Sequence, residues 1–331
     1  MSSKREQVLD TLQRSLRTLK EYFQDPYVSE IMVNPGGRVF IERAGEMLDM
    51  GSENRISDEE ITLAIRMLGK SVAQEPVPNT PTALISASFE DLRIAGVLAP
   101  TSVGGPSLTI RKHQSPESRP TLEELIDKKM LTAEQGKLLL DLFVDKRKNF
   151  IVAGATGSGK TTFVNALLMK IPKHERLITI EDSVELHPNV PNLVALLANA
   201  EVGITAQLLV KQTLRMAPSR LILGETRGTE TYDLIRAFNS GHDGSLSTVH
   251  ASSAEDACGA LEMLFQMSVP ANASLSAEAA RGFIARAVHV IVHVKRQFVE
   301  DQGKLRTVRS IHQIVALKGV KNGFFELEAL A

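Results

Sequence analysis

The spacing of apolar residues changes along the chain, and near the start it has the periodicity of an α-helix. Near the start they recur every three or four positions with Lys and Arg between them, which is the spacing of one face of an amphipathic helix. We expect this helix to pack on its own domain. The alternative is a helix that binds a membrane surface or a partner. The positions that form the apolar face are Val8, Leu12, Leu16, Leu19 and Phe23.

Short apolar runs separated by turn residues come next, and they predict antiparallel strand pairs. Between the two pairs, Ser57–Gly69 predicts a helix, because Ser57 and Glu60 have the spacing of a capping box. Residues 1–112 are therefore predicted to form a small α+β domain with an antiparallel sheet. The two predicted pairs are Ile31–Val33 with Arg38–Glu42, and Leu92–Leu98 with Ser107–Arg111.

Residues 113–120 are polar and include two prolines, and we interpret them as a linker. The pattern of apolar positions changes after them. Two capping boxes, opened by Thr121 and Thr132, then predict two helices. After these two helices, short continuous apolar runs, typical of buried strands, alternate with helical segments. This alternation is typical of a parallel sheet covered by helices. Residues 121–331 are thus predicted to form an α/β domain. Its first strands are predicted at Phe150–Ala153, Leu177–Ile180 and Leu221–Leu223.

Composition and charge exclude several classes of protein. A chain of 331 residues corresponds to about two domains. With 38 basic and 39 acidic residues the net charge is −1, which argues against a protein that grips duplex DNA. One cysteine, Cys258, excludes a disulfide scaffold and a four-cysteine zinc module and fits a reducing cytosol. No apolar run is long enough to span a membrane, and the charged start, Met1–Gln7, is unlike a signal peptide.

The strongest chemical signal is a phosphate-binding loop. Gly154–Thr161 matches G-x-x-x-x-G-K-[ST], with an apolar strand before it and a helix, Thr162–Met169, after it. Its glycines let backbone N–H groups surround a phosphate, Lys160 adds a positive charge, and Thr161 offers a hydroxyl to Mg²⁺. We therefore predict ATP and Mg²⁺ as ligands. The predicted nucleotide-binding residues are Gly154, Ala155, Thr156, Gly157, Ser158, Gly159, Lys160, Thr161 and Thr162.

Acidic residues at predicted strand ends supply the remaining chemistry. Glu225 follows one strand, but Gly224 stands where a second acid is common, so another acidic cluster must help with the metal. Glu181 and Asp182 fit, because the carboxyl ends of parallel strands face the ligand. The polar loop that ends at His250 is expected to contact the γ-phosphate; its spacing to Cys258 matches no common zinc pattern.

Four segments together resemble the secretion traffic ATPases. They correspond to the Walker A, Asp, Walker B and His boxes of that family: Gly154–Thr161, Ile180–Glu185, Leu223–Gly228 and Gly241–Ala251. Within the family the chain is most similar to the ATPases of type IV secretion and bacterial conjugation. Ser183 and Ser219 depart from the usual proline and aspartate. The resemblance implies a RecA-like P-loop domain after the smaller N-terminal domain.

The resemblance also implies site roles and an assembly. Glu225 would be the catalytic glutamate and His250 the γ-phosphate contact. Members form hexameric rings at the cytoplasmic face of the inner membrane, where they meet inner-membrane components of the apparatus. The family also places N-terminal-domain arginines at the nucleotide, and these are matched here by Arg93 and Arg111. The acids matching the metal-side box are Glu181, Asp182 and Glu185.

The predicted function is an ATP-driven motor for substrate transfer or pilus assembly in a type IV secretion or conjugation apparatus. A type IV pilus or type II assembly ATPase is the near alternative, although many type II members carry a tetracysteine module that one cysteine excludes. A nucleic-acid motor is disfavoured by the net charge and by the low aromatic content of 5%. A ring that binds nucleotide without turnover is disfavoured by Glu225.

Overall fold

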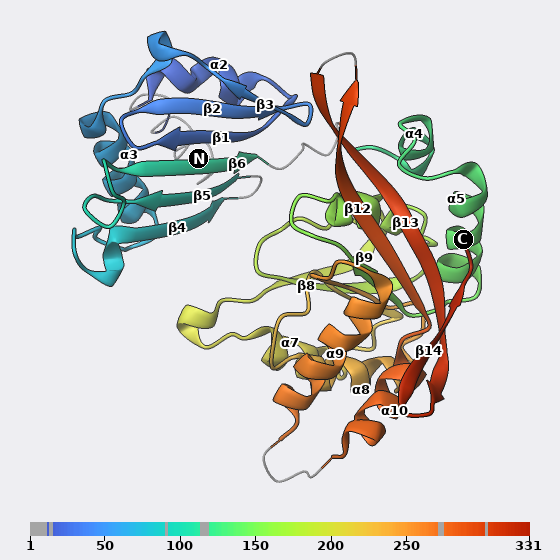
Figure 1. Cartoon of the computed structure of the whole chain (residues 1–331). Coiled ribbons are helices and arrows are strands. Elements are labelled where there is room, and N and C mark those ends of the chain that lie inside the picture. Colours follow the sequence, from blue (N-terminus) through green and yellow to red (C-terminus); the bar gives the residue numbers. More distant parts are fainter. Residues whose placement is uncertain (1–11, 13–15, 90–91, 113–118, 271–274, 302–303) are drawn as a thin grey trace. The chain divides into compact units, whose positions relative to one another are not determined.

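The chain divides into two units with separate cores in the computed structural model (Figure 1). The first unit comprises Met1–Ser118 with Glu300–Thr307, and the second comprises Arg119–Val299 with Val308–Ala331. The structure describes residues 12, 16–89, 92–112, 119–270, 275–301 and 304–331. Most of the predicted linker, 113–118, lies outside the described residues.

A six-stranded antiparallel sheet forms the first unit, with strand order β3-β2-β1-β6-β5-β4. Both predicted strand pairs are confirmed, as β1 with β2 and as β5 with β6. The two edge strands, β3 and β4, were not predicted: β3 is short and largely exposed, and β4 is rich in Ser and Ala. The strands are β1 (Val28–Asn34), β2 (Arg38–Arg43), β3 (Glu46–Asp49), β4 (Leu84–Phe89), β5 (Leu92–Val97) and β6 (Ser107–Lys112).

Helices cover one face of this sheet and bury its apolar side. Leu12, Leu16 and Leu19 are fully buried in the core, and Phe23 is nearly so, which confirms that this apolar face packs on its own domain. The segment is not one continuous helix, because a 3-10 turn, Arg17–Leu19, precedes α2 (Lys20–Gln24). Val8 lies outside the described residues. The predicted second helix is α3 (Asp58–Ser71), and its capping box is formed by Ser57 and Glu60.

The second unit is built on an eight-stranded sheet with strand order β14-β13-β12-β7-β11-β10-β8-β9. The strands from β12 to β9 in this order pair in parallel, as predicted for an α/β domain, whereas β13 and β14 are antiparallel. The strands are β7 (Phe150–Ala153), β8 (Arg176–Glu181), β9 (Asn192–Leu197), β10 (Arg220–Leu223), β11 (Leu246–Val249), β12 (Val290–Asp301), β13 (Lys304–Lys321) and β14 (Phe324–Ala329).

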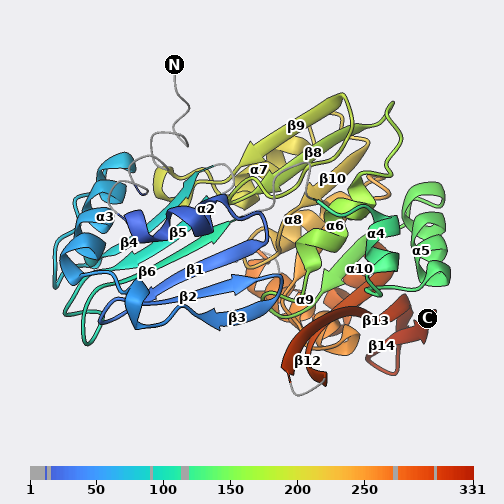
Figure 2. The same cartoon turned by 90° about the horizontal axis from the view of Figure 1, so that it is seen from above.

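Helices lie on both sides of this sheet (Figure 2). Alternation along the strands divides the core of this unit between the two faces. Phe150 and Val152 of β7 belong to one apolar cluster with α4, α5 and α6, while Ile151 and Ala153 belong to the other with α7 to α10. A parallel sheet buried on both faces is the result. The helices are α4 (Leu122–Asp127), α5 (Ala133–Leu140), α6 (Lys160–Leu168), α7 (Ala206–Thr213), α8 (Thr231–Phe238), α9 (Ala254–Ser268) and α10 (Ala277–Ala287).

A buried ion pair secures the amino-terminal edge of the parallel sheet. Arg220, at the start of β10, is fully buried and donates two hydrogen bonds of 2.7 and 2.8 Å to the carboxylate of Glu175. The same guanidinium donates to the carbonyl of Phe143 at 2.6 Å, and Arg147 reaches Glu175 at 2.7 Å. Arg220, Glu175 and Arg147 therefore each have an opposite charge beside them, as burial requires.

Glu175→Gln should destabilise the second unit, because it leaves the buried Arg220 charge without its counter-ion. We expect the free energy of unfolding to fall by about 3–5 kcal/mol. Urea unfolding followed by circular dichroism measures it. Lys146→Ala is the control, since it breaks an exposed pair with Asp141 and should change stability by no more than about 1 kcal/mol. Equal effects of the two substitutions would contradict the assigned role.

Lowering the pH should also destabilise the second unit, because it protonates Glu175. Burial works to raise the pKa of Glu175, but the hydrogen bonds and charges of Arg220 and Arg147 outweigh it and hold this pKa below its ordinary value. The stabilisation is therefore complete above the pKa of the unfolded chain, about 4.3 for Glu, and it is lost as the pH falls through the lowered native pKa. Glu175→Gln should flatten that part of the pH–stability profile.

Candidate active site

Four parallel strands end at the same edge of the second sheet, and each is followed by a predicted site segment. The phosphate loop follows β7, Glu181 ends β8, Glu225 comes two residues after β10, and His250 follows β11. The pairing brings these ends together, because Ala153 is the partner of Val249 and Leu223 is the partner of Ile180. The structure thus assembles at one edge residues that are far apart in the sequence.

The phosphate loop has the shape of a cradle for an anion. Gly157 and Gly159 have φ angles of +70° and +97°, which favour glycine. A Cβ on Gly154 would lie 2.4 Å from the carbonyl oxygen of Val294 and 2.6 Å from Oγ of Ser158, so a side chain cannot fit there. Oγ of Ser158 is buried with no hydrogen-bond partner among the described residues. Since α6 begins directly after the loop, at Lys160, the residues present fit a nucleotide phosphate.

Lys160 is buried and folds back over the loop. Its ammonium donates hydrogen bonds to the carbonyls of Gly154 and Ala155, at 2.7 and 3.0 Å, and lies 3.4 Å from Nδ1 of His250. The N–H of Ser158 is likewise bonded to the Ala155 carbonyl, at 3.2 Å. These are the donors that a phosphate needs, so phosphate binding has to replace bonds within the loop. Thr161 and Thr162 follow in the first turn of α6 and are half-buried.

Glu225 stands at the centre of a row of charged side chains. Nε2 of His250 lies 2.6 Å from Oε1 of Glu225, although this buried oxygen makes no well-aligned hydrogen bond among the described residues. The other oxygen accepts a very short hydrogen bond from Arg227, whose guanidinium also donates to Asp182 at 2.7 Å. The hydrogen bond to Glu225 raises the pKa of Arg227 against the effect of burial, so the arginine stays cationic.

The three residues predicted to hold Mg²⁺, Thr161, Glu181 and Asp182, differ in the interactions that they make in the structure. Oε1 of the buried Glu181 accepts hydrogen bonds from the backbone N–H groups of Glu185 and Leu186, both at 2.9 Å, and so holds the following loop. Asp182 is exposed and paired with Arg227. Thr161 has its hydroxyl at the amino end of α6, beside the phosphate cradle. Of the two acids, Glu181 is thus held by the backbone and Asp182 by a salt bridge.

Arg93 and Arg111 lie in the first unit, whereas the phosphate loop lies in the second. They are direct cross-strand neighbours on β5 and β6, on the face opposite the buried Ile94 and Ile110, as the alternation predicted. The neighbouring β1 brings Glu30 opposite Arg111, with Nε 3.8 Å from the carboxylate. Like charges placed directly opposite destabilise a sheet. The Glu30 carboxylate beside Arg111 offsets part of that repulsion.

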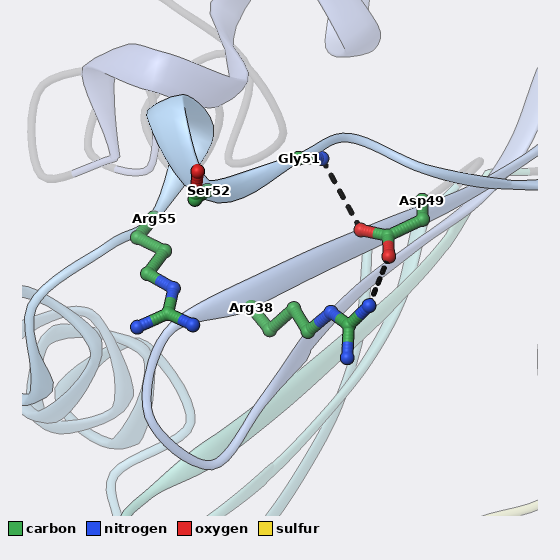
Figure 3. Close-up of a pocket in the computed structure, with 5 residues that line it drawn as sticks. All are labelled: Arg38, Asp49, Gly51, Ser52 and Arg55. Carbon is green, nitrogen blue, oxygen red and sulfur yellow. Dashed lines mark hydrogen bonds and ion pairs between the residues drawn. The ribbon is translucent and has the colours of Figure 1, made fainter.

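A depression of about 290 Å³ lies elsewhere in the first unit (Figure 3). Arg38 and Arg55 line it, but Arg38 is paired with Asp49, which also accepts a hydrogen bond from the backbone N–H of Gly51 at 3.2 Å. Ser52 completes the lining. The depression is open and its arginines are exposed, so we assign it no part in the site.

Sequence reasoning missed two arginines beside the phosphate loop. Nε of Arg309, on β13, donates a hydrogen bond of 2.9 Å to the carbonyl of Gly157. A Cβ on Gly157 would lie 2.9 Å from Nη1 of Arg296, on β12. Neither arginine belongs to a motif, and each is more than 130 positions away from the loop in the sequence, so no local signal identifies them.

Comparison with known proteins identifies the family. The family described as type II/IV secretion system protein matches residues 13–321. The chain belongs to this family. Among the described residues of this secretion-family protein, no helix is both long and apolar enough to cross a membrane.

Its relatives extend over nearly the whole chain. The conjugal transfer protein TrbB of Rhizobium radiobacter is 32% identical over 93% of this chain and 89% of its own length. The type IV secretion system protein VirB11 of Brucella abortus is 32% identical over 87% of this chain and 86% of its own. The ATPase DotB of Yersinia pseudotuberculosis has the same fold, with a TM-score of 0.63, 19% identity and coverage of 92% and 79%. The predicted resemblance, fold class and secretion-ATPase function are confirmed.

Glu225→Gln should leave ATP binding by this secretion-family ATPase nearly unchanged and reduce turnover by at least about a hundredfold. The amide keeps the shape of the side chain but can neither accept a proton nor carry negative charge beside an attacking water. Phosphate release and calorimetric binding of ATP are the two measurements. His250→Ala should slow hydrolysis less. Wild-type turnover by Glu225→Gln would remove Glu225 from the chemistry.

Proposed function

We propose that this secretion-family ATPase forms a homo-hexameric ring that powers substrate transfer or pilus assembly in a type IV secretion or conjugation apparatus. The observation that carries the proposal is the meeting of Lys160, His250 and Glu225 beside one phosphate loop. The relatives named TrbB and VirB11 point to the apparatus. By the same analogy the ring works at the cytoplasmic face of the inner membrane and docks on inner-membrane components there.

Each residue at the edge of the parallel sheet has a distinct proposed role. The loop Gly154–Thr162 binds the phosphates of ATP, and Lys160 neutralises the β and γ groups. Glu225 orients and activates the attacking water, and its Oε1 has to exchange its present contact with Nε2 of His250, at 2.6 Å, for that water. His250 lies between Lys160 and Glu225, so its ring can donate to the γ-phosphate and register its loss.

Mg²⁺ is the proposed cofactor, and Thr161 is its proposed direct ligand. The ion would neutralise charge on the β and γ phosphates, as in other P-loop enzymes. Glu181 and Asp182 are proposed to accept hydrogen bonds from its water shell. Asp182 has to exchange its bond to Arg227 for this role, and Glu181 can keep one oxygen on the backbone of Glu185 and Leu186.

Arg93 and Arg111 are proposed to complete the site. The charge that spreads over a transferring phosphoryl group needs a cation besides Lys160, and Arg227 is already engaged by two carboxylates. Arg93 and Arg111 are neighbours on one sheet face, so both guanidinium groups can donate to the same anion. ATP would then draw the two units together, and ring assembly would raise turnover per subunit.

Lys160→Ala tests the phosphate loop. Removing the ammonium takes away the charge that neutralises the phosphates in the ground and transition states, so both ATP affinity and hydrolysis should be lost. Calorimetry with ATP and phosphate release measure the two effects. Normal folding is checked by comparing the unfolding transition with that of wild type. Near-normal turnover would show that Gly154–Thr162 is not the active site.

Arg93→Ala and Arg111→Ala test the arginine pair. Each should lower specific ATPase activity by about 10³-fold or more, the effect of losing an arginine that stabilises the transition state. Light scattering confirms that the oligomer is intact, and calorimetry confirms that it still binds ATP. Arg55→Ala, which removes an exposed arginine of the same unit, should hydrolyse normally. Wild-type rates in both variants and in the double variant would refute this role.

A further inference from the structure

One strand of the second sheet runs past the phosphate loop. β12 pairs with β7 only as far as His293, which lies opposite Ala153, the last residue of β7. It then continues to Asp301, while the neighbouring chain turns into the loop. The carbonyl oxygen of Val294 lies so close to Gly154 that no Cβ fits between them. The segment of β12 after Val294 therefore borders the loop.

This segment carries Arg296 and Phe298, which are two positions apart and so share one face of the strand. The guanidinium of Arg296 lies against Gly157 of the loop and over the ring of Phe298, with 5.0 Å from the guanidinium carbon to the ring centroid. Nε of Arg296 is buried without a hydrogen-bond partner among the described residues. The ring of Phe298 is 62% exposed. An unpartnered donor and an exposed aromatic ring are thus held together at the tip of the loop.

The two flanks of the loop differ in chemistry. On one side, β11 and β10 carry His250 and Glu225, where the γ-phosphate and the attacking water belong. On the other side, β12 carries a cation and an aromatic ring, with no carboxylate of its own before Glu300. ATP is elongated, and its phosphates bridge the loop. When the γ-phosphate faces Glu225, the adenosine end therefore extends toward β12.

We propose that Arg296 and Phe298 form the adenosine side of the nucleotide site. Phe298 stacks on the base, as aromatic rings do with every nucleobase. Arg296, held between that ring and Gly157, binds the α-phosphate through its guanidinium, whose Nε has no hydrogen-bond partner among the described residues. Arg309, which donates to the Gly157 carbonyl, holds the tip of the loop in place for both. This subsite rests on the proposed nucleotide site at Gly154–Thr162.

Three substitutions and two ligands test the subsite in the full-length protein. Calorimetry measures the affinity for ADP, which has a base, and for inorganic tripolyphosphate, which has none. Phe298→Ala should weaken ADP binding about tenfold and leave tripolyphosphate binding unchanged. Arg296→Ala should weaken both ligands. Lys295→Ala removes the adjacent cation on the opposite face of β12 and should change neither affinity.

Phe324→Ala is the matched control for the aromatic ring, because Phe324 is 75% exposed on β14 of the same sheet. It should bind ADP like wild type. Unchanged ADP affinity in both Phe298→Ala and Arg296→Ala overturns the subsite, and equal weakening of ADP and tripolyphosphate by Phe298→Ala overturns base stacking. Lys160→Ala tests the nucleotide site separately from the adenosine subsite. If this variant keeps wild-type ADP affinity, the assignment of the phosphate loop as the nucleotide site is wrong.

Discussion

Parallel pairing of β7 with β11, β11 with β10, and β10 with β8 is the constraint on which the site depends. Parallel strands all end at one edge, so the residues that follow them converge wherever they stand in the sequence. The pairing is secured from both faces, since every residue of β7, β10 and β11 is buried. The pair formed by Arg220 and Glu175 secures the opposite edge. Catalytic geometry is thereby a consequence of core packing.

The charged groups at this edge largely neutralise one another. Lys160 bonds to loop carbonyls, Glu225 lies between His250 and Arg227, and Asp182 accepts a hydrogen bond from a second nitrogen of that arginine. Such mutual pairing lowers the cost of gathering charge in a partly buried place. It also means that nucleotide has to exchange existing bonds rather than fill an uncommitted site. Binding energy is then available to move the loop, which is what a motor requires.

The motifs of the candidate site could be predicted from the sequence because each is local. The phosphate loop needs glycines and a lysine at fixed spacing, and Glu225 and His250 follow short apolar strands. The pairing of Asp182 with Arg227 and the approach of Arg296 and Arg309 to Gly157 could not be predicted, because they depend on strand order and on how far β12 runs beyond β7. The edge strands β3 and β4 lack a strong apolar rhythm for a related reason: an edge strand buries less.

Each unit contains arginines whose positions lower the stability of the fold. Arg93 and Arg111 face each other across β5 and β6, and Arg296 keeps a buried nitrogen without a partner beside Gly157. Each arrangement is unfavourable in isolation, because like charges repel and a buried donor loses its hydration. An anionic ligand relieves both, since phosphate supplies negative charge and acceptor oxygens together. The arginines of each unit, taken separately, are for this reason proposed as contacts of a phosphate group.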